Sequence, residues 1–390
     1  MQIIEALFWI SLAIIFYTFM GYGLILYILV QIKRWFQKKA AFADDFEPTV
    51  TLVIPCFNEA DILIIKIKNC KELDYPKDKL RIVFITDGST DYSQDVLETH
   101  PDIDVLHENK RAGKTAAENR AMKFVDTPFV IFSDANTLLN KEAIRFIIRH
   151  FSNEETGCVS GEKRVLMDEK DTASAAGEAL YWKYESLLKK WDSELNTTVG
   201  AAGELVAFRC SLYTDLPEDT LLDDFMQSML IAAKGYKIVY EPNAFAAETA
   251  SENVAEELKR KIRIAAGGWQ SMSRLAPYLS PLKSPLLYFQ YFSHRLLRWT
   301  ITPVLLILVF MMNLVLLRLD SPIYQWLMVG QLLFYAGAVI GYALENRKIR
   351  FKPFFIPYYF CVMNYAVLAG LKKYLSGKQK ATWDKAKRKP

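Results

Sequence analysis

The chain has 390 residues, of which 52 % are apolar and 13 % aromatic, and it carries a formal net charge of +4. This apolar share is high for a purely soluble protein. The small positive charge is concentrated beside apolar runs, which suits membrane headgroups and argues against a nucleic-acid partner. The five cysteines include no C-x-x-C pair, so we expect reduced thiols and no disulfide framework.

Four uncharged apolar runs predict membrane segments. The first, 6–32, is longer than the roughly 20 residues that a spanning helix needs, and it lacks the basic start of a signal peptide. Lys33 and Arg34 follow it, which predicts that the next segment lies in the cytoplasm. The other three runs lie towards the C-terminal end, at 299–317, 321–344 and 353–371.

Whether the last run, 353–371, crosses the membrane decides on which side the C-terminal tail lies. The loop before it and the tail after it, 372–390, are both basic and favour the cytoplasm. We therefore expect three crossings, with 353–371 lying in the interface or re-entrant; four crossings remain an alternative.

Aromatic residues beside three basic side chains predict a further interfacial helix at 284–298. The expected organisation is an N-terminal membrane helix with its basic flank (1–37), a cytoplasmic domain (38–283), this interfacial helix, C-terminal membrane segments (299–371) and a basic cytoplasmic tail (372–390).

Short apolar runs alternate with helix-length segments in the cytoplasmic domain. Strands are expected at 49–56, 80–87, 103–106 and 128–134, and helices at 59–73, 92–99 and 114–125. Such alternation predicts a parallel sheet covered on both faces. The second half predicts, in order, a helix at 172–195, a strand at 204–209, a helix at 223–234 and a return strand at 237–240. The fold class is therefore α/β with a mixed, mostly parallel sheet.

Aspartates end two of the predicted parallel strands. Asp87 closes LRIVFITD, and Asp134 closes PFVIFSD. Ligands of such sheets bind outside the carboxyl ends of the strands, so we expect both carboxylates at one crevice; the alternative is that each caps a helix. Asn136 lies two residues after Asp134, on the same side of an extended segment. These oxygens suit Mg²⁺ or Mn²⁺ shared with substrate phosphates.

Two further motifs carry candidate chemistry. In NKRAGK, Arg111 and Lys114 surround a glycine before a helix, where they could contact a diphosphate. In LLDDF, Asp223 and Asp224 start a helix; they either favour its dipole or supply a general base. The chain has no G-x-x-x-x-G-K-[ST] motif and no G-x-G-x-x-G after a strand, which argues against a P-loop enzyme and a dinucleotide-binding domain.

Seven motifs occur in this order over 49–270: VTLVIPCFNEA, FITDGSTD, NKRAGKTAAENRAM, VIFSDANTLL, GAAGELVAFR, LLDDF and RKIRIAAGGWQ. Together with the flanking membrane segments, they resemble the membrane-integrated family 2 glycosyltransferases, the group that contains cellulose, chitin and hyaluronan synthases. The resemblance implies a GT-A type nucleotide-sugar-binding domain and an inverting transfer from a nucleoside diphosphate sugar, usually UDP-linked.

The resemblance also implies roles on the donor side. Asp87 would contact the base or ribose of the nucleotide. Asp134 and Asn136 would stand where the family has D-x-D and bind the diphosphate through the metal, although Asn136 removes one charge. Asp224 would be the catalytic base. The loop beside Asp87 would complete the nucleotide site with Pro55, Phe57, Asn58 and Glu59.

The family's Q-x-x-R-W signature falls at RKIRI. Arg263 is kept and would neutralise the leaving diphosphate, but Arg260 replaces the glutamine and Ile264 replaces the tryptophan. Trp269, one turn later, could compensate on the acceptor side or be a membrane-interface aromatic. The other expected acceptor-side residues are Gly203, Glu204 and Asp223, with Trp383 in the tail as the anchor of a gating segment.

The expected function is that of a bacterial inner-membrane glycosyltransferase with its catalytic domain in the cytoplasm. With Mn²⁺ or Mg²⁺, it would add sugars from a nucleotide sugar to a cell-surface or exported polysaccharide, among membrane lipids and export partners. One alternative is the transfer of a single sugar to a lipid-linked acceptor. Another is a non-catalytic scaffold of a synthase complex.

Overall fold

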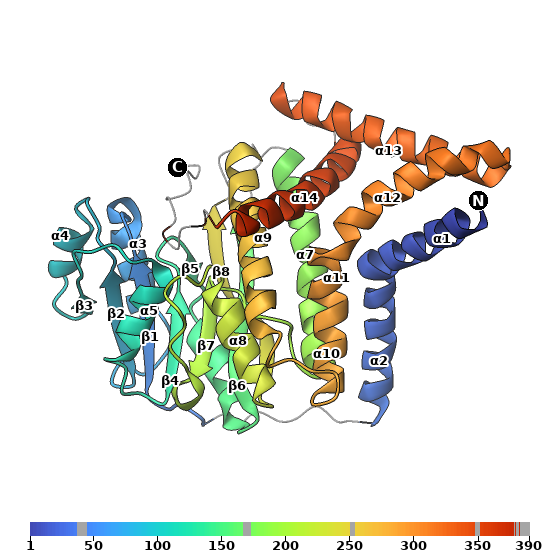
Figure 1. Ribbon diagram of the computed structural model, residues 1–390. Coiled ribbons are helices and arrows are strands. Elements are labelled where there is room, and N and C mark those ends of the chain that lie inside the picture. The colour runs from blue at the N-terminus through green and yellow to red at the C-terminus, as the bar shows by residue number, and fades with distance from the viewer. Residues whose placement is uncertain are drawn as a thin grey trace.

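The computed structural model describes residues 1–36, 45–166, 173–249, 254–347 and 352–377, together with 379 and 382. The described chain forms an α/β domain, and long helices pack along one side of it and extend beyond it (Figure 1).

A single sheet lies at the centre of the α/β domain. Its strands are β1 (Val50–Cys56), β2 (Leu80–Thr86), β3 (Asp104–Leu106), β4 (Phe129–Ser133), β5 (Leu138–Leu139), β6 (Thr156–Leu166), β7 (Leu205–Arg209) and β8 (Lys237–Thr249). They lie in the order β3-β2-β1-β4-β7-β6-β8-β5. Strands β1 to β4 are parallel, β7 runs antiparallel to both of its neighbours, and β6 and β8 are parallel. The prediction of a mixed, mostly parallel α/β sheet is confirmed.

Helices cover both faces of this sheet. They are α3 (Ala60–Lys71), α4 (Ser93–Glu98), α5 (Lys114–Met122), α6 (Ala143–Ile148), α7 (Ala173–Leu195), α8 (Asp223–Ala233) and α9 (Val254–Leu275), with short 3₁₀ turns η2 (Arg149–Ser152) and η3 (Cys210–Leu212). The predicted return strand at 237–240 is longer than expected and reaches Thr249 as β8.

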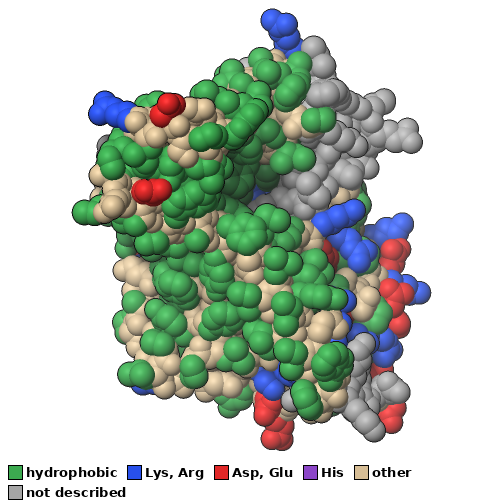
Figure 2. Space-filling view, turned by 90° about the vertical axis from the view of Figure 1, so that its right-hand side faces the viewer, with side chains coloured by type: hydrophobic (Ala, Val, Ile, Leu, Met, Phe, Trp, Pro, Cys, Tyr) green, Lys and Arg blue, Asp and Glu red, His purple; other side chains and the backbone are tan. Residues whose placement is uncertain are grey.

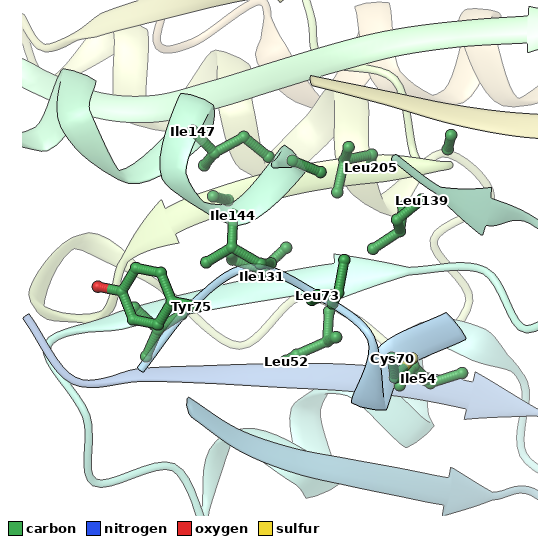
Figure 3. Close-up of a cluster of buried hydrophobic side chains, with 14 of the residues drawn as sticks. Leu52, Ile54, Cys70, Leu73, Tyr75, Ile131, Leu139, Ile144, Ile147 and Leu205 are labelled. Atoms are coloured by element: carbon green, nitrogen blue, oxygen red, sulfur yellow. The ribbon is translucent and has the colours of Figure 1, made fainter. Parts of the chain in front are cut away.

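The two faces of the sheet carry separate hydrophobic clusters. Along β1, Leu52 and Ile54 point towards α3 and α6 (Figure 3), whereas Val53 packs in the cluster that includes α5 and α8. This alternation follows from the two-residue period of a strand. Each fully buried aliphatic side chain of this kind stabilises the fold by about 1.5–3 kcal/mol. The sheet is therefore a rigid platform for the loops at its edge.

The remaining helices belong to the apolar ends of the chain. They are α1 (Gln2–Phe16), the π-helical turn η1 (Tyr17–Gly21), α2 (Tyr22–Phe36), α10 (Pro285–Tyr291), the π-helical turn η4 (Phe292–Leu296), α11 (Leu297–Trp299), α12 (Ile301–Leu316), the 3₁₀ turn η5 (Leu317–Leu319), α13 (Pro322–Asn346) and α14 (Lys352–Leu375). Four described stretches are long and apolar enough to cross a membrane: Gln2–Phe36, Ile301–Leu319, Pro322–Glu345 and Pro353–Leu375. The number of crossings stays a prediction.

The first apolar run bends between α1 and α2, at the turn η1 (Figure 1). A π-helical turn inside a helix is a common cause of such a bend. After the bend α2 packs along α7, where the Tyr22 hydroxyl donates to Asp192 and Lys33 Nζ donates to the carbonyl of Glu194 at 2.8 Å. The second half of the predicted span is thus packed against the α/β domain.

Helix α14, which contains the whole run 353–371, packs against α9. A Cβ atom on Gly370 would lie 2.5 Å from the Cβ atom of Ala265, so the two helices touch at this glycine. One end of this apolar run therefore meets the α/β domain directly. Whether the run also crosses a membrane stays a prediction.

A buried charge cluster joins the predicted interfacial helix to α7. Asp192 is 0 % exposed and accepts hydrogen bonds from His294 Nδ1 at 2.6 Å and Gln290 Nε2 at 3.0 Å. Glu185 lies 2.6 Å from Arg295 Nη2 and 3.0 Å from Arg298 Nη1. These inward-facing pairs fix the 285–299 segment to the domain.

Candidate functional site

The site forms where β4 ends and β7 begins. In this antiparallel pair Ser133 lies opposite Leu205. Asp134 follows Ser133 and Glu204 precedes Leu205, so the predicted metal ligand and a predicted acceptor-side residue leave adjacent strands at the same edge. This placement unites two motifs that are 70 residues apart in the sequence.

Lys114, the first residue of α5, holds the carboxylates of this edge together. Its Nζ atom lies 2.8 Å from Oδ1 of Asp134, 3.7 Å from Oδ2 of Asp223 and 3.8 Å from Oε1 of Glu118. Burial alone would lower the pKa of Lys114, but the charges of Asp134, Asp223 and Glu118 outweigh it and raise this pKa well above its ordinary value. Lys114 is therefore a fixed cation between the predicted metal ligand and the LLDDF motif.

Asp224, the predicted base, is the second residue of α8. Burial and the neighbouring charge of Asp223 raise its pKa to about 7. A Cβ atom on Gly203 would lie 3.1 Å from Oδ2 of Asp224 and 3.4 Å from Nζ of Lys114, so Gly203 leaves room directly at the carboxylate. A carboxylate with a pKa near neutrality can take a proton from a hydroxyl, which is what a general base requires.

Glu118 makes a carboxyl pair with Asp223. Burial and the charge of Asp223 raise the pKa of Glu118 well above its ordinary value, and the two side chains are hydrogen-bonded. The shift favours the protonated form of Glu118 more than in an isolated glutamate. Glu118 was not predicted, although its position four residues after Lys114 on one helix is the signal that could have found it.

Asp87 braces the loop that carries Arg111. It is 1 % exposed, and its two carboxylate oxygens accept the backbone N–H groups of Ala112 at 3.0 Å and Gly113 at 2.7 Å. Gly88 has a φ of +66°, and a Cβ atom there would lie 2.7 Å from the backbone nitrogen of Arg111. Asp87 thus fixes the NKRAGK loop; its contact with a nucleotide stays a prediction.

The loop after β1 borders the same crevice. The guanidinium of Arg111 lies 3.6 Å from the ring centroid of Phe57, a close cation–π contact. Asn58 has a φ of +55°, which asparagine tolerates better than most residues, and its Oδ1 accepts the N–H of Thr90 at 2.7 Å. The β1 and β2 loops are therefore tied together. The other two predicted members, Pro55 in β1 and Glu59 before α3, are buried beside them.

The Asp134–Asn136 turn rests on a buried lysine that sequence reasoning missed. Lys66, on α3, is 0 % exposed and donates to Ser133 Oγ at 2.9 Å and to the carbonyl of Thr137 at 2.8 Å. Burial lowers the pKa of Lys66. The lysine fixes the residues on both sides of the D-x-N turn.

The donor set at this turn fits a metal that the substrate helps to hold. In the part of the chain that the structure describes, no group of three or more His, Cys, Asp or Glu side chains could bind a metal. Asp134 and Asn136 would supply two oxygen ligands, and Mg²⁺ in particular is commonly bound by one or two carboxylates plus substrate phosphates. The ammonium of Lys114, which is ion-paired with Asp134 in this structure, would contact the same phosphate oxygens.

Helix α9 positions the segment before Asp223. A Cβ atom on Gly267 would lie 2.7 Å from Cγ of Leu222, and Gln270 binds this segment through the N–H of Leu221 at 3.0 Å. Arg263 lies on the same helix, and Trp269 is half-buried against the cluster that contains α8. The roles of Arg263 and Trp269 stay predictions.

Glu204 is paired on its other side with Lys163, whose Nζ lies 2.6 Å from Oε1 of Glu204. Burial would raise the pKa of Glu204, but the charge of Lys163 outweighs it and lowers this pKa. Glu204 therefore stays ionised, in contrast to Asp224. Lys163 was not predicted, and Trp383, the predicted gating residue, lies outside the described residues.

Comparisons with known proteins agree with this arrangement. Residues 51–216 match the family model described as Glycosyl transferase family 2. The poly-beta-1,6-N-acetyl-D-glucosamine synthase of Staphylococcus aureus (strain MSSA476) is 26 % identical over 260 residues, which cover 64 % of this chain and 61 % of the synthase. The synthase of the same name from Staphylococcus epidermidis is 24 % identical over 235 residues, 58 % of this chain and 56 % of the relative. The chain thus spans about three-fifths of the length of these curated relatives.

A solved structure shares the fold. The mannosyltransferase PcManGT from Pyrobaculum calidifontis, in complex with GDP-Man and Mn²⁺, superposes with a TM-score of 0.72 at 24 % identity and covers 95 % of this chain and 99 % of its own. The strand order, the carboxylate-lined sheet edge and the family match agree, and the chain contains a family 2 glycosyltransferase domain of the GT-A type.

Proposed function

We propose that this chain is an inverting glycosyltransferase. It moves a sugar from a nucleoside diphosphate sugar, UDP-linked, to a hydroxyl of a growing cell-surface or exported polysaccharide. The observation that carries the proposal is the position of Lys114, whose ammonium lies 2.8 Å from Asp134 and beside Asp224. One cation thus separates the predicted diphosphate site from the predicted base. The polysaccharide synthases among the relatives support this acceptor class.

In the proposed reaction the acceptor hydroxyl lies beside Gly203 and gives its proton to Asp224. Its oxygen forms a bond to the anomeric carbon while the bond from that carbon to the diphosphate breaks. Attack from the face opposite the leaving group inverts the configuration. Lys114 and Arg263 would stabilise the charge that develops on the departing diphosphate.

A divalent metal, Mn²⁺ or Mg²⁺, would be held by Asp134 and Asn136 and would supply charge neutralisation at the diphosphate. The Mn²⁺ in the complex of the mannosyltransferase supports this assignment. Lys66 keeps the turn in shape through its bonds to Ser133 and Thr137.

The proposed location is the bacterial inner (cell) membrane, with the catalytic domain in the cytoplasm. Figure 2 supports a lipid-facing side: apolar side chains cover most of the face on which α1 and α2 lie, and charged side chains lie mainly at its margins. On α2 the exposed apolar residues run along its whole length, from Leu24 and Ile28 to Trp35 and Phe36. We therefore propose that one side of α2 contacts lipid and any export partner, while its other side packs against α7.

A second candidate is the transfer of one sugar to a lipid-linked acceptor. The observation in its favour is at the altered Q-x-x-R-W motif, where Ile264 replaces the tryptophan and α14 covers the next residue, Ala265, through Gly370. A wide polymer channel has little room at that contact. Product length separates the two functions, since a ladder indicates a polysaccharide and one addition indicates the lipid-linked product.

The test is nucleoside diphosphate release by the full chain in lipid nanodiscs with Mn²⁺, across a panel of nucleotide sugars with membrane lipid extract as acceptor. We expect release with one donor, and at least a hundredfold loss in Asp224→Asn, as is usual for removal of a general base. Asp219→Asn, an exposed carboxylate four residues before Asp223, is the matched control and should keep full activity. Equal turnover of Asp224→Asn and wild type would contradict the base assignment.

A further inference from the structure

Two polar groups of buried residues near the transfer site have no hydrogen-bond partner among the residues that the structure describes. Lys189, on α7, is 5 % exposed, and its ammonium forms no hydrogen bond or ion pair with any described residue. Tyr240, on β8, is 6 % exposed, and among the same residues its hydroxyl has no hydrogen-bond partner. Buried polar groups are normally paired, so two neighbouring exceptions call for a ligand.

The two groups belong to one location. Nζ of Lys189 lies 5.9 Å from the ring centroid of Tyr240 and 5.8 Å from that of Trp182. Lys163 and Lys261 approach the same indole, at 5.3 Å and 5.4 Å. Ammonium groups from β6, α7 and α9 thus converge around Trp182.

Lys189, unlike the other two lysines, forms no ion pair with a described carboxylate. Lys163 is neutralised by Glu204, and Lys261 lies 3.4 Å from Glu257. The carboxylates whose charges act most strongly on Lys189 each bind another side chain. Glu185 is ion-paired with two arginines, Glu204 is ion-paired with Lys163, and Glu162 accepts a hydrogen bond from the hydroxyl of Ser186 at 2.7 Å.

Burial lowers the pKa of Lys189. The ammonium of Lys189 contacts aromatic rings and forms no ion pair with a described carboxylate, so its burial is costly and an anion bound beside it would remove that cost.

The location lies between the reactive centre and the membrane helices. On one side, the charge of Glu204 acts both on Lys189 and on Asp224. On the other side, α7 meets η1, where the hydroxyl of Tyr184 donates to the carbonyl of Phe19 at 2.7 Å. We assign the donor's diphosphate to Arg111 and Lys114, of which Lys114 is ion-paired with Asp134 at 2.8 Å. A ligand at Lys189 therefore belongs to the acceptor, which comes from the membrane side.

We propose that Lys189 and Tyr240 form an anion subsite that binds a phosphate on the lipid carrier of the acceptor, while the acceptor's sugar hydroxyl lies at Asp224. An ammonium and a phenol both donate hydrogen bonds, and phosphate oxygens accept them. The subsite rests on the proposed transfer reaction and specifies the class of its acceptor, a glycan carried on a lipid phosphate. It applies equally to a growing polysaccharide and to a single addition.

The test is a binding measurement without nucleotide sugar, so that it does not depend on catalysis. The full chain in nanodiscs of zwitterionic lipid is titrated calorimetrically with farnesyl phosphate, farnesol or inorganic phosphate. Wild type should bind farnesyl phosphate at least tenfold more tightly than farnesol or inorganic phosphate. Lys189→Met should abolish that preference and Tyr240→Phe should reduce it severalfold. The matched control is Lys190→Met, an exposed lysine next in sequence, and it should bind as wild type does.

Three results would overturn the subsite. They are equal binding of farnesyl phosphate and farnesol, unchanged binding by both Lys189→Met and Tyr240→Phe, and binding of inorganic phosphate as tight as that of farnesyl phosphate, which would indicate free phosphate as the ligand. Tyr240→Phe removes one oxygen only, so the test holds even if Lys189→Met does not fold. Hydrolysis of the nucleotide sugar in the absence of acceptor is measured in parallel. A variant that loses phosphate binding but keeps this hydrolysis affects the subsite alone, so failure of the subsite and failure of the proposed function can be told apart.

Discussion

Gly203 leaves open the space in front of the Asp224 carboxylate. A Cβ atom on Gly203 would lie 3.1 Å from Oδ2 of Asp224, closer than most side-chain contacts allow. Lys114 is on the far side of the same space, 3.4 Å from that hypothetical atom. The atoms in the way are the ends of two side chains, which can move, so the main effect of a methyl group here falls on the room for a substrate.

Gly203→Ala should therefore lower the rate of sugar transfer at least tenfold while the melting temperature stays within about 2 °C of wild type. Initial rates and thermal unfolding of the same preparation check both values. The contrasting variant is Gly235→Ala, at a φ of +95° with no neighbouring atom within 4 Å. It should lose about 1 kcal/mol of stability from backbone strain and keep its activity. A large loss of stability in Gly203→Ala would contradict this reasoning.

The pKa of Asp224, about 7, predicts how activity depends on pH. A base must be ionised, so kcat/KM should rise as the pH increases through about 7 and then level off. The rise should disappear from whatever residual activity Asp224→Asn retains. A rate that is flat between pH 6 and pH 8 in wild type would show that another group takes the proton.

The same pKa predicts the sign of a stability effect. The folded pKa of Asp224 is above the value of about 3.9 for an unfolded aspartate, so between these values the folded state binds the extra proton. Stability from this group is present below about pH 4 and is lost as the pH rises towards 7. Asp224→Asn stays neutral, and its melting temperature should exceed that of wild type at pH 8 but not at pH 4. Unfolding scans at the two pH values measure the difference.

Glu118 should be replaceable by glutamine but not by alanine. Burial and the charge of Asp223 raise the pKa of Glu118, and the neutral amide of glutamine has the same shape and can donate a hydrogen bond to Asp223. We expect Glu118→Gln to keep transfer within about threefold, whereas Glu118→Ala leaves Asp223 without its donor and loses at least tenfold. Steady-state kinetics of both variants decide the point; a severe loss in Glu118→Gln would mean that the carboxyl group ionises during the reaction.

Lys66→Met should loosen the Asp134–Asn136 turn. The variant removes the two hydrogen bonds to Ser133 and Thr137, and we expect a loss of about 2 kcal/mol in stability and a raised KM for the nucleotide sugar. Lys68→Met, on the exposed side of the same helix, is the matched control. Chemical unfolding and donor kinetics supply the two readouts. A change in stability without any change in KM would make Lys66 structural only.

The regular half of the domain could be predicted from sequence. Strands β1, β2 and β4 are apolar runs that are followed within two residues by Asn58, Asp87 and Asp134, and the signals for strand, turn and helix agree there. The predicted return strand ends at Tyr240, two residues before Pro242, and a proline normally ends a paired strand. In the structure the pairing of β6 with β8 shifts between Gly161 and Glu162, which bypasses that proline and lets β8 continue.

Only those residues of the candidate site that belong to recognisable sequence motifs could be predicted. Asp134, Asp224 and Lys114 stand in recognisable local patterns, and the structure brings them together. Lys66 and Lys189 lie in helices with ordinary spacing, and their importance comes from burial and from partners that are distant in sequence. Single-sequence patterns do not contain that information, because they describe local periodicity and not tertiary neighbours.

The antiparallel strand β7 has a mechanical consequence. Asp134 and Glu204 leave two strands that are hydrogen-bonded to each other from Phe129–Arg209 to Ser133–Leu205. The proposed donor side and the proposed acceptor side of the site therefore cannot move apart as hinged lobes without breaking this pairing. We expect substrates to enter and leave through movement of the loops and helices above this edge, while the spacing between the two strand ends stays the same.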